Sequence, residues 1–347
     1  MDRKKTSLIP FWILLLPLFF VGCADFRHRA TREGARSRAK TRSLPGRADE
    51  VAIWADRDNP INSVLICNDK APMGALYVFD MSGKQVSRSE RLNRPVGVSV
   101  RYDVNLGGEV IDVVACGIRS TNEMKIFKMD KETRKLIDIT TLGGISSGFP
   151  DRTYGICLYK RLSDGQLFAF LSRKETDNIH QIMLEDDGTG KFKGTIVRKF
   201  GKKDQKSFVE GMVADDEWGY FYCSDERHAI LKYFADPSVG KDPFIQMFGV
   251  QDNIRGDREG LSIYRKPNRK GYIVVSSQGD STFKVYNREG KNKFIKSFAL
   301  HDVWRSDGIA STALPIPPHY PTGVFAAHND GDNNYAIFDW FTCTGLK

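Results

Sequence analysis

The sequence has little of what zinc sites and thiol redox centres require. Its 347 residues include six cysteines and six histidines, with no Cys-x-x-Cys pair and no histidine-rich stretch. Both kinds of centre depend on such close spacings, so neither is supported. Four of the cysteines fall within apolar runs typical of strands: Cys67, Cys116, Cys157 and Cys223. We predict that these four are small, buried core residues without disulfide partners.

A long apolar run is also missing. The apolar stretch from Ile9 to Val21 is shorter than the roughly 20 residues that a membrane-spanning helix needs. It follows Arg3-Lys4-Lys5 and ends at Val21-Gly22-Cys23, which resembles a bacterial lipobox. We expect residues 1–22 to be a lipoprotein signal peptide, and Cys23 to be acylated and to anchor the exported protein to a lipid bilayer. Ordinary cleaved secretion and an uncleaved helix are the alternatives.

The folded part of the chain carries almost no excess charge. The formal net charge is +9, and all but one of these excess positive charges lie in the first 48 residues. The remainder is nearly neutral, so we expect no nucleic-acid partner. Residues 23–48 are basic and contain few large apolar side chains, which predicts a lipidated, disordered basic tether.

Helical periodicity is nearly absent after residue 24, and a repeat of strand-like segments takes its place. The clearest series is Leu65–Lys70, Val114–Arg119, Ala169–Lys174, Phe221–Glu226, Val274–Gly279 and Phe325–Asp330, whose last residues are 49 to 55 positions apart. Other strand-like segments precede and follow each member. Six repeats of four antiparallel strands predict an all-β fold, a six-bladed β-propeller over residues 49–347. A large β-sandwich would not explain so regular a period.

Charged residues recur at two places in this repeat. In a propeller, the start of each innermost strand and the end of the next strand lie at the same mouth of the central channel. The acids at these places are Asp49, Glu50, Glu210, Glu226, Asp257, Glu259 and Asp307, and the other polar residues are Lys70, Arg119, Tyr154 and Lys174. We therefore predict a mouth with one basic side and one acidic side.

Such a mouth has two chemical consequences. Clustered carboxylates repel one another unless a cation lies among them, and oxygen ligands without His or Cys favour Ca²⁺. The basic side suits an anionic substrate, and Arg119 could bind a phosphate with two donors. A polar mouth that is merely solvated is the alternative.

Several motifs resemble the β-propeller phytases, which are calcium-dependent phosphatases acting on phytate, myo-inositol hexakisphosphate. The most specific are Glu210–Gly219, Glu259–Tyr264, Ser306–Ile309 and Val100–Asp103, and the similarity runs from Asp49 to Trp340. The resemblance implies several calcium ions held by the seven acids, and phosphate bound by Lys70, Arg119, Tyr154 and Lys174. It also implies phosphate-ester hydrolysis by a metal-activated water, with Glu210, Glu226 and Tyr154 in catalysis.

The chain departs from the family pattern at a few positions. Asp69 replaces one lysine of an adjacent pair and would turn an acid toward the phosphate; Val51 and Ala310 also differ, and the loop 301–305 is short. These changes favour a second hypothesis, a non-catalytic propeller that binds a phosphorylated ligand or a protein. A lactonase-type hydrolase is a third, although a neutral ester needs no basic clamp. We expect a monomer that binds phytate or another inositol phosphate.

Overall fold

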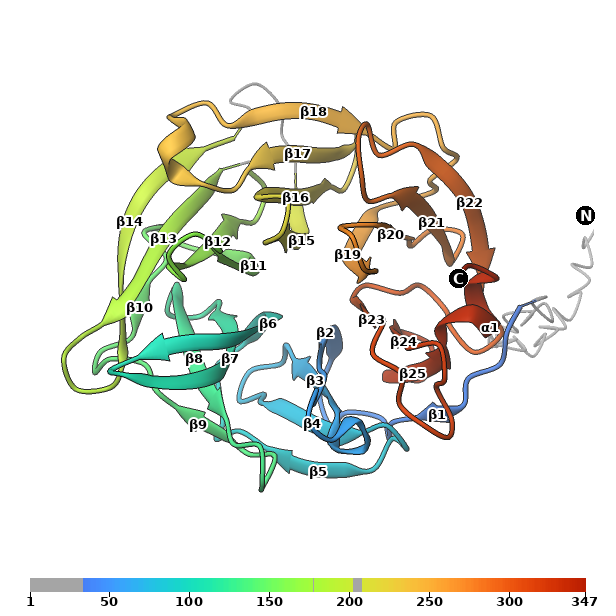
Figure 1. The fold of residues 1–347 in the computed structure, drawn as a ribbon, viewed down its shortest axis with the longest axis horizontal. Coiled ribbons are helices and arrows are strands. Elements are labelled where there is room, and N and C mark those ends of the chain that lie inside the picture. The colour runs from blue at the N-terminus through green and yellow to red at the C-terminus, as the bar shows by residue number, and fades with distance from the viewer. Residues whose placement is uncertain (1–33, 177, 202–207) are drawn as a thin grey trace, which may run out of the picture. The chain divides into compact units, whose positions relative to one another are not determined.

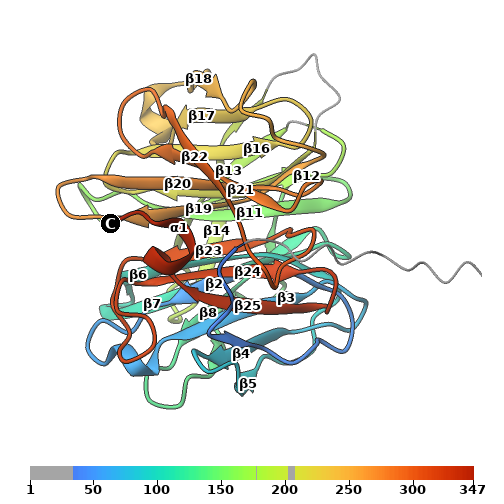
Figure 2. The ribbon, with the colours of Figure 1, turned by 90° about the vertical axis from the view of Figure 1, so that its right-hand side faces the viewer.

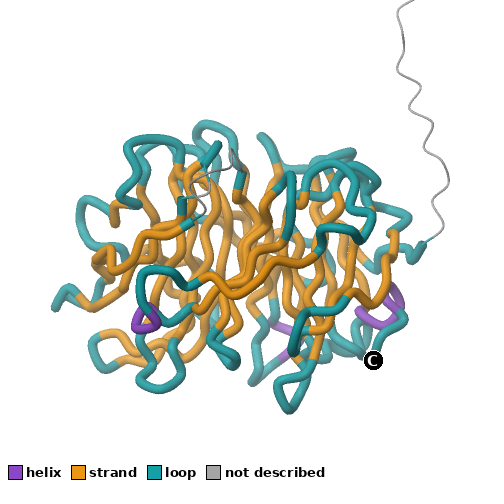
Figure 3. The backbone as a smooth tube through the Cα atoms, turned by 90° about the horizontal axis from the view of Figure 1, so that it is seen from above, coloured by secondary structure: helices purple, strands orange, loops and turns teal. Residues whose placement is uncertain are grey.

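Six antiparallel sheets surround a common centre, one for each sequence repeat (Figure 1). The computed structural model describes residues 34–176, 178–201 and 208–347. The predicted six-bladed β-propeller is confirmed. Each sheet runs outward from its innermost strand, and the loops gather at the two faces of the ring (Figure 3).

Four blades follow the chain without interruption. The first contains β2 (Ala48–Trp54), β3 (Val64–Asp69), β4 (Leu76–Asp80) and β5 (Gln85–Arg88). The third contains β11 (Thr153–Lys160), β12 (Leu167–Arg173), β13 (Ile179–Asp186) and β14 (Phe192–Phe200). The fourth contains β15 (Val209–Asp215), β16 (Tyr220–Asp225), β17 (Ile230–Phe234) and β18 (Phe244–Phe248). The fifth contains β19 (Arg258–Arg265), β20 (Gly271–Ser277), β21 (Thr282–Asn287) and β22 (Phe294–Ala299).

The second and sixth blades have unusual outer edges. The second contains β6 (Pro95–Leu106), β7 (Glu109–Ile118) and β8 (Glu123–Met129), and two short strands pair with β8, namely β9 (Leu136–Asp138) and β10 (Ile145–Ser146). The sixth contains β23 (Ile309–Thr312), β24 (Val324–Asn329) and β25 (Asn334–Asp339), and its outer strand is β1 (Ala39–Lys40). The last blade is therefore completed by a segment that precedes the first, labelled β1 beside β25 in Figure 1; Figure 2 shows β23, β24 and β25 of this blade from the side.

This closure corrects the predicted end of the tether. We expected residues 23–48 to be disordered, but Ala39 and Lys40 pair with β25. The amides of Thr41 and Leu44 then donate to carbonyls of the sixth blade, each at 2.9 Å, and Leu44 is buried. Pairing at a sheet edge uses backbone groups, so a basic sequence gives little sign of it. The predicted signal peptide, Cys23 and the predicted tether up to residue 33 lie outside the described residues.

Helices are few and short. The described residues contain α1 (Trp340–Thr344) and the 3₁₀ turns η1 (Pro60–Asn62) and η2 (Pro237–Val239). In the part of the chain that the structure describes, no helix has the length and apolar character needed to span a membrane.

The core consists of six hydrophobic clusters, one between each pair of adjacent blades. The second strand of a blade has neighbours on both of its faces, and every residue of β3 is buried. Such strands are apolar over most of their length and turn polar at the end, which is why they gave the clearest repeat. The four cysteines predicted to be core residues are buried, as is Cys343, and none of the five forms a disulfide.

Candidate active site

A β-bulge recurs at the same place in five of the six inner strands. At each bulge, a step of three residues along the inner strand matches a step of two along its partner, so the inner strand carries one extra residue. The bulged pairs are Asp49-Glu50, Gly97-Val98, Tyr154-Gly155, Glu210-Gly211 and Glu259-Gly260. A bulge re-aims a side chain that strict alternation would direct elsewhere. The repeated bulge explains why residues 50 positions apart reach one mouth.

Glycine lets adjacent bulges touch. A Cβ added to Gly211 would lie 2.2 Å from the carbonyl oxygen of Glu259, and one added to Gly260 would lie 2.6 Å from that of Asp307. The Gly260 amide also donates to the Asp307 carbonyl at 3.0 Å. Only glycine allows backbones to approach so closely. The recurring acid-glycine pair therefore holds successive carboxylates together around the channel.

The predicted residues line a cavity of about 660 Å³ at this mouth. Nine of the eleven line it directly: Lys70, Arg119, Tyr154, Lys174, Glu210, Glu226, Asp257, Glu259 and Asp307. The other two, Asp49 and Glu50, lie on β2 next to Lys70, which forms an ion pair with Asp49.

Three buried glutamates form the tightest part of the site. Carboxylate oxygens of Glu210, Glu226 and Glu259 lie within 4.8 Å of one another. The Tyr154 hydroxyl donates to Glu226 Oε1 at 3.1 Å. Buried oxygens of Glu210 and Glu259 accept no hydrogen bond from the described residues. Unpaired buried carboxylate oxygens are costly unless a cation or a proton satisfies them.

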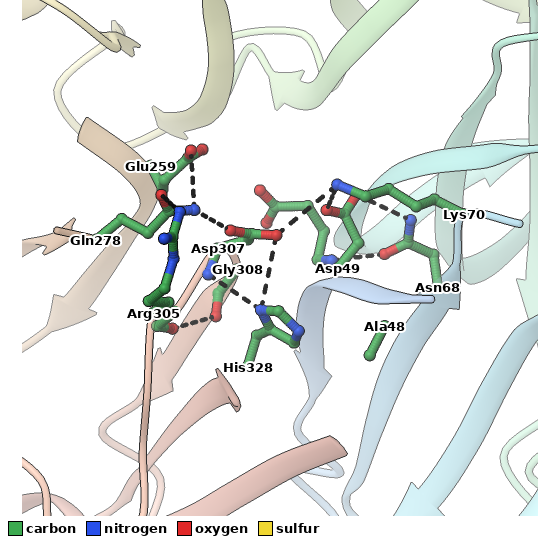
Figure 4. A network of polar contacts seen from close by, with 12 residues as sticks. Ala48, Asp49, Asn68, Lys70, Glu259, Gln278, Arg305, Asp307, Gly308 and His328 are labelled. Atoms are coloured by element: carbon green, nitrogen blue, oxygen red, sulfur yellow. Dashed lines mark hydrogen bonds and ion pairs between the residues drawn. The ribbon is translucent and has the colours of Figure 1, made fainter. Parts of the chain in front are cut away.

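Lys70 joins this acidic side to the first blade (Figure 4). Its ammonium pairs with Asp49 and lies 3.7 Å from Asp307 Oδ2. The amide group of Gln278 donates to Asp307 and, at 3.3 Å, to Glu259. The backbone amide of Asp307 donates to His328 Nδ1 at 3.1 Å. The positive charge of Lys70 is therefore already shared between two acids.

Arg119 and Lys174 are differently placed. Both lie near the ring of Tyr154, with the Arg119 guanidinium 5.7 Å and the Lys174 ammonium 4.9 Å from its centroid. Neither pairs with a carboxylate among the residues that the structure describes. Two cations without acidic partners at the edge of a cavity suit an anionic ligand.

Burial raises the pKa values of the clustered acids. It raises the pKa of Glu210 to about 8 and that of Asp307 to about 6, and the charge of Asp49 adds to both. Burial, against the hydrogen bond from Tyr154 and with a contribution from Asp257, raises the pKa of Glu226 to about 7. These three groups therefore hold protons at a pH where ordinary carboxyls are ionised.

The pKa values of the other acids in the cluster also depend on burial and on neighbouring charges. Burial, followed by neighbouring carboxylates, sets the pKa values of Glu50 and Glu259 well above their usual range. Burial acts in this direction on Asp49 too, but the Lys70 ammonium outweighs it and lowers the pKa of that acid. Without a bound cation, the site thus keeps one strong ion pair and several protonated acids.

The mouth is also lined by four bases that the sequence did not lead us to predict: Arg47, Arg94, Arg227 and Arg305. Arg227 and Arg305 lie beside the acids, so the predicted division into a basic and an acidic side is wrong in its strict form. Arg227 directly follows Glu226 in the repeat and could have been found there. Arg305 donates to Gln278 at 3.2 Å from the short loop 301–305, for which the repeat gives no position.

The interpretation of Asp69 as an acid facing the phosphate is also wrong. Its buried carboxylate accepts the backbone amides of Gly46, Arg47 and Ala71 at 2.9, 2.7 and 3.1 Å. Asp69 does not line the cavity. It accepts the backbone amide of Arg47, and Arg47 does line the cavity.

We expect Asp69→Lys to destabilise the protein without raising its activity. The change removes three charge-assisted hydrogen bonds and buries an ammonium, so the free energy of unfolding should fall by at least about 3 kcal/mol. Chemical denaturation measures the change, and Asp58→Lys, at an exposed site of the same blade, is the matched control. A stable and more active Asp69→Lys protein would contradict this structural role.

Comparison with known proteins identifies the family. The phytase family matches residues 26–340. The chain belongs to the phytase family. A curated phytase, the 3-phytase of Bacillus subtilis strain 168, is 35% identical over 312 residues, which are 84% of this chain and 79% of that protein.

Solved structures extend the likeness in fold beyond the phytase family. An auxiliary nutrient binding protein from Bacteroides thetaiotaomicron has a TM-score of 0.54 at 10% identity, covering 86% of this chain and 70% of that one. Hydrazine synthase of Kuenenia stuttgartiensis has a TM-score of 0.53 at 10% identity, covering 87% and 97%. At such low identity these matches show the fold alone.

Proposed function

We propose that this protein is a phytase, a phosphomonoesterase that releases phosphate from myo-inositol hexakisphosphate. Membership of the phytase family supports the activity. One observation in the mouth supports it most: Arg119 and Lys174, without acidic partners, stand across Tyr154 from the buried cluster of Glu210, Glu226 and Glu259. A phosphate group held by Arg119 and Lys174 would place its phosphorus beside the three glutamates.

We propose further that the carboxylates bind calcium. The donor set is rich in carboxylate oxygens and contains no cysteine, which suits a hard cation. The unpaired buried oxygens of Glu50, Glu210 and Glu259 are consistent with ligands that lack their ion. Glu210, Glu226, Glu259 and Asp307, with Asp49, Glu50 and Asp257 around them, would hold the ions. Bound calcium supplies positive charge to the phosphate oxygens and acidifies water at the site.

The protein residues would divide the remaining work. Arg119 and Lys174 hold the phosphate group and stabilise its equatorial oxygens. Water attacks phosphorus in line with the ester oxygen, and Glu226 takes the proton that the water loses. The P–O bond to inositol breaks, and the departing inositol oxygen takes a proton from solvent. Burial and nearby carboxylates raise the pKa of Tyr154, so its hydroxyl stays protonated and fixes Glu226 through their hydrogen bond.

Phosphate release from phytate tests the proposal. We expect release in calcium, none in chelator, and a loss of tenfold or more in kcat/KM for Arg119→Ala, which removes a charged hydrogen-bond donor. Arg88→Ala, at an exposed position on β5, is the control. Phytate binding without release in calcium would support the non-catalytic propeller, and full activity in chelator would refute the role of calcium.

The position of the anchor is a separate proposal. We propose that Cys23 is acylated and holds the exported enzyme at a membrane surface, because Val21-Gly22-Cys23 follows an apolar run and a basic start. Cys23→Ser should move the protein from the membrane fraction to the soluble fraction or leave it unprocessed. Wild-type protein that is soluble and carries no fatty acid by mass spectrometry would disprove it.

A further inference from the structure

The channel contains a second cavity, at the other ends of the inner strands. Its volume is about 390 Å³, and all six innermost strands contribute to its wall. Three of the residues that line it are arginines, Arg57, Arg101 and Arg265, and none is an aspartate or a glutamate. Ala310, where the family pattern has an aspartate, also lines it. The charge facing this cavity is therefore of one sign.

Two of these arginines are held unusually close together. The Nη2 atoms of Arg101 and Arg265 donate to the same acceptor, the carbonyl oxygen of Ala214, at 3.1 and 2.8 Å. Like charges that share one acceptor repel each other unless an anion lies between them. The arrangement thus places two guanidinium groups side by side at the wall of the cavity.

Only one of the two forms a direct ion pair with a carboxylate. Arg101 Nε lies 2.8 Å from Asp216 Oδ2, and Arg57 pairs with Asp103 at 2.8 Å. Arg265 forms no direct ion pair with a described carboxylate, although the charges of Asp215 and Asp216 act on it, and its side chain is exposed. The fully buried Asp215 is already bonded to Arg288. Arg265 is left as the cation that a ligand in the cavity would meet.

Hydroxyl groups around the same cavity have hydrogens to donate. Ser99 Oγ accepts the Leu158 amide at 3.0 Å, and Thr312 Oγ1 accepts the Leu314 amide at 3.2 Å. Within the described chain neither hydroxyl donates to another residue. Both line the cavity. Hydroxyl donors beside guanidinium groups are the usual composition of an oxyanion site.

We propose that this cavity is a second anion site, which binds a small tetrahedral oxyanion such as inorganic phosphate. Arg265 supplies a guanidinium without a direct ion pair, Arg101 a second guanidinium, and Ser99 and Thr312 neutral donors. The site is separate from the carboxylate-lined mouth and shares no lining residue with it. It needs no calcium, because no carboxylate faces it.

Calorimetric titration of the purified protein with inorganic phosphate, in chelator, tests the proposal. We expect binding that Arg119→Ala leaves intact, since that residue lies at the other mouth, and that Arg265→Gln weakens at least about tenfold. Arg269→Gln, an exposed arginine on the same hairpin that does not line the cavity, is the matched control. Unchanged unfolding midpoints would show that both variants are folded.

Three results would overturn it. They are no phosphate binding by the wild type in chelator, equal binding by Arg265→Gln, or loss of binding in Arg119→Ala, which would place the anion at the mouth. Acetate provides a second comparison. We expect weaker binding of acetate, because it offers two oxygens where phosphate offers four, and tighter binding would contradict a site for a tetrahedral ion.

Discussion

Replacement of Glu210 by Gln is expected to cut phosphate release from phytate sharply and to weaken calcium binding. Glu210 belongs to the glutamate cluster within 4.8 Å, and one of its buried oxygens has no described hydrogen-bond partner. The amide keeps the shape of the side chain but removes a full ligand charge. We expect kcat/KM to fall by about 10²–10³-fold, as when one electrostatic stabiliser of the transition state is removed.

The same substitution should leave the metal-free fold intact. Burial raises the pKa of Glu210 to about 8, so at neutral pH this side chain is largely protonated in the absence of an ion. A neutral amide in its place should leave the melting temperature in chelator unchanged or higher. Glu185→Gln, at an exposed position on β13, is the control for activity. Retention of phosphate release without calcium binding would show that catalysis does not depend on this cluster.

The regular features of the fold could be predicted from the sequence. The second strands of the blades are buried on both faces, so each is an apolar run with a polar end, and the period of those ends gave the number of blades. The same period placed the acids and bases around one mouth. The bulges at Glu210 and Glu259 were not foreseen, although the acid-glycine pairs that require them are visible in the sequence.

The features that depend on backbone pairing or on a single loop could not be predicted. Strand β1 completes the sixth blade through backbone hydrogen bonds from a segment whose composition indicates disorder. Asp69 occupies a position at which the family pattern has a base, but its carboxylate binds backbone amides and holds Arg47 at the mouth. The role of a charged residue depends on which groups its side chain contacts, and composition and spacing do not specify those contacts.

Calcium should stabilise the protein strongly at pH 8 and weakly at pH 5. In chelator, the pKa values of Glu210, Glu226 and Asp307 are about 8, 7 and 6, whereas an unfolded chain has ordinary values near 4. The folded protein therefore holds more protons than the unfolded chain between about pH 4 and 8. Its stability falls as the pH rises through this window, by on the order of 1.4 kcal/mol per pH unit for each such proton.

Calcium reverses this trend, because it competes with those protons and binds the folded state alone. At a hundredfold excess over Kd, one bound ion adds about 2.7 kcal/mol to the free energy of unfolding, and Kd falls as the carboxyls ionise. Melting curves at pH 5, 6.5 and 8, with calcium and with chelator, should diverge as the pH rises. Glu210→Gln should reduce both the fall of stability with pH in chelator and the stability gained from calcium, because the Glu210 carboxyl contributes to both. A gain from calcium that is equal at all three values, or absent, would exclude these acids as its ligands.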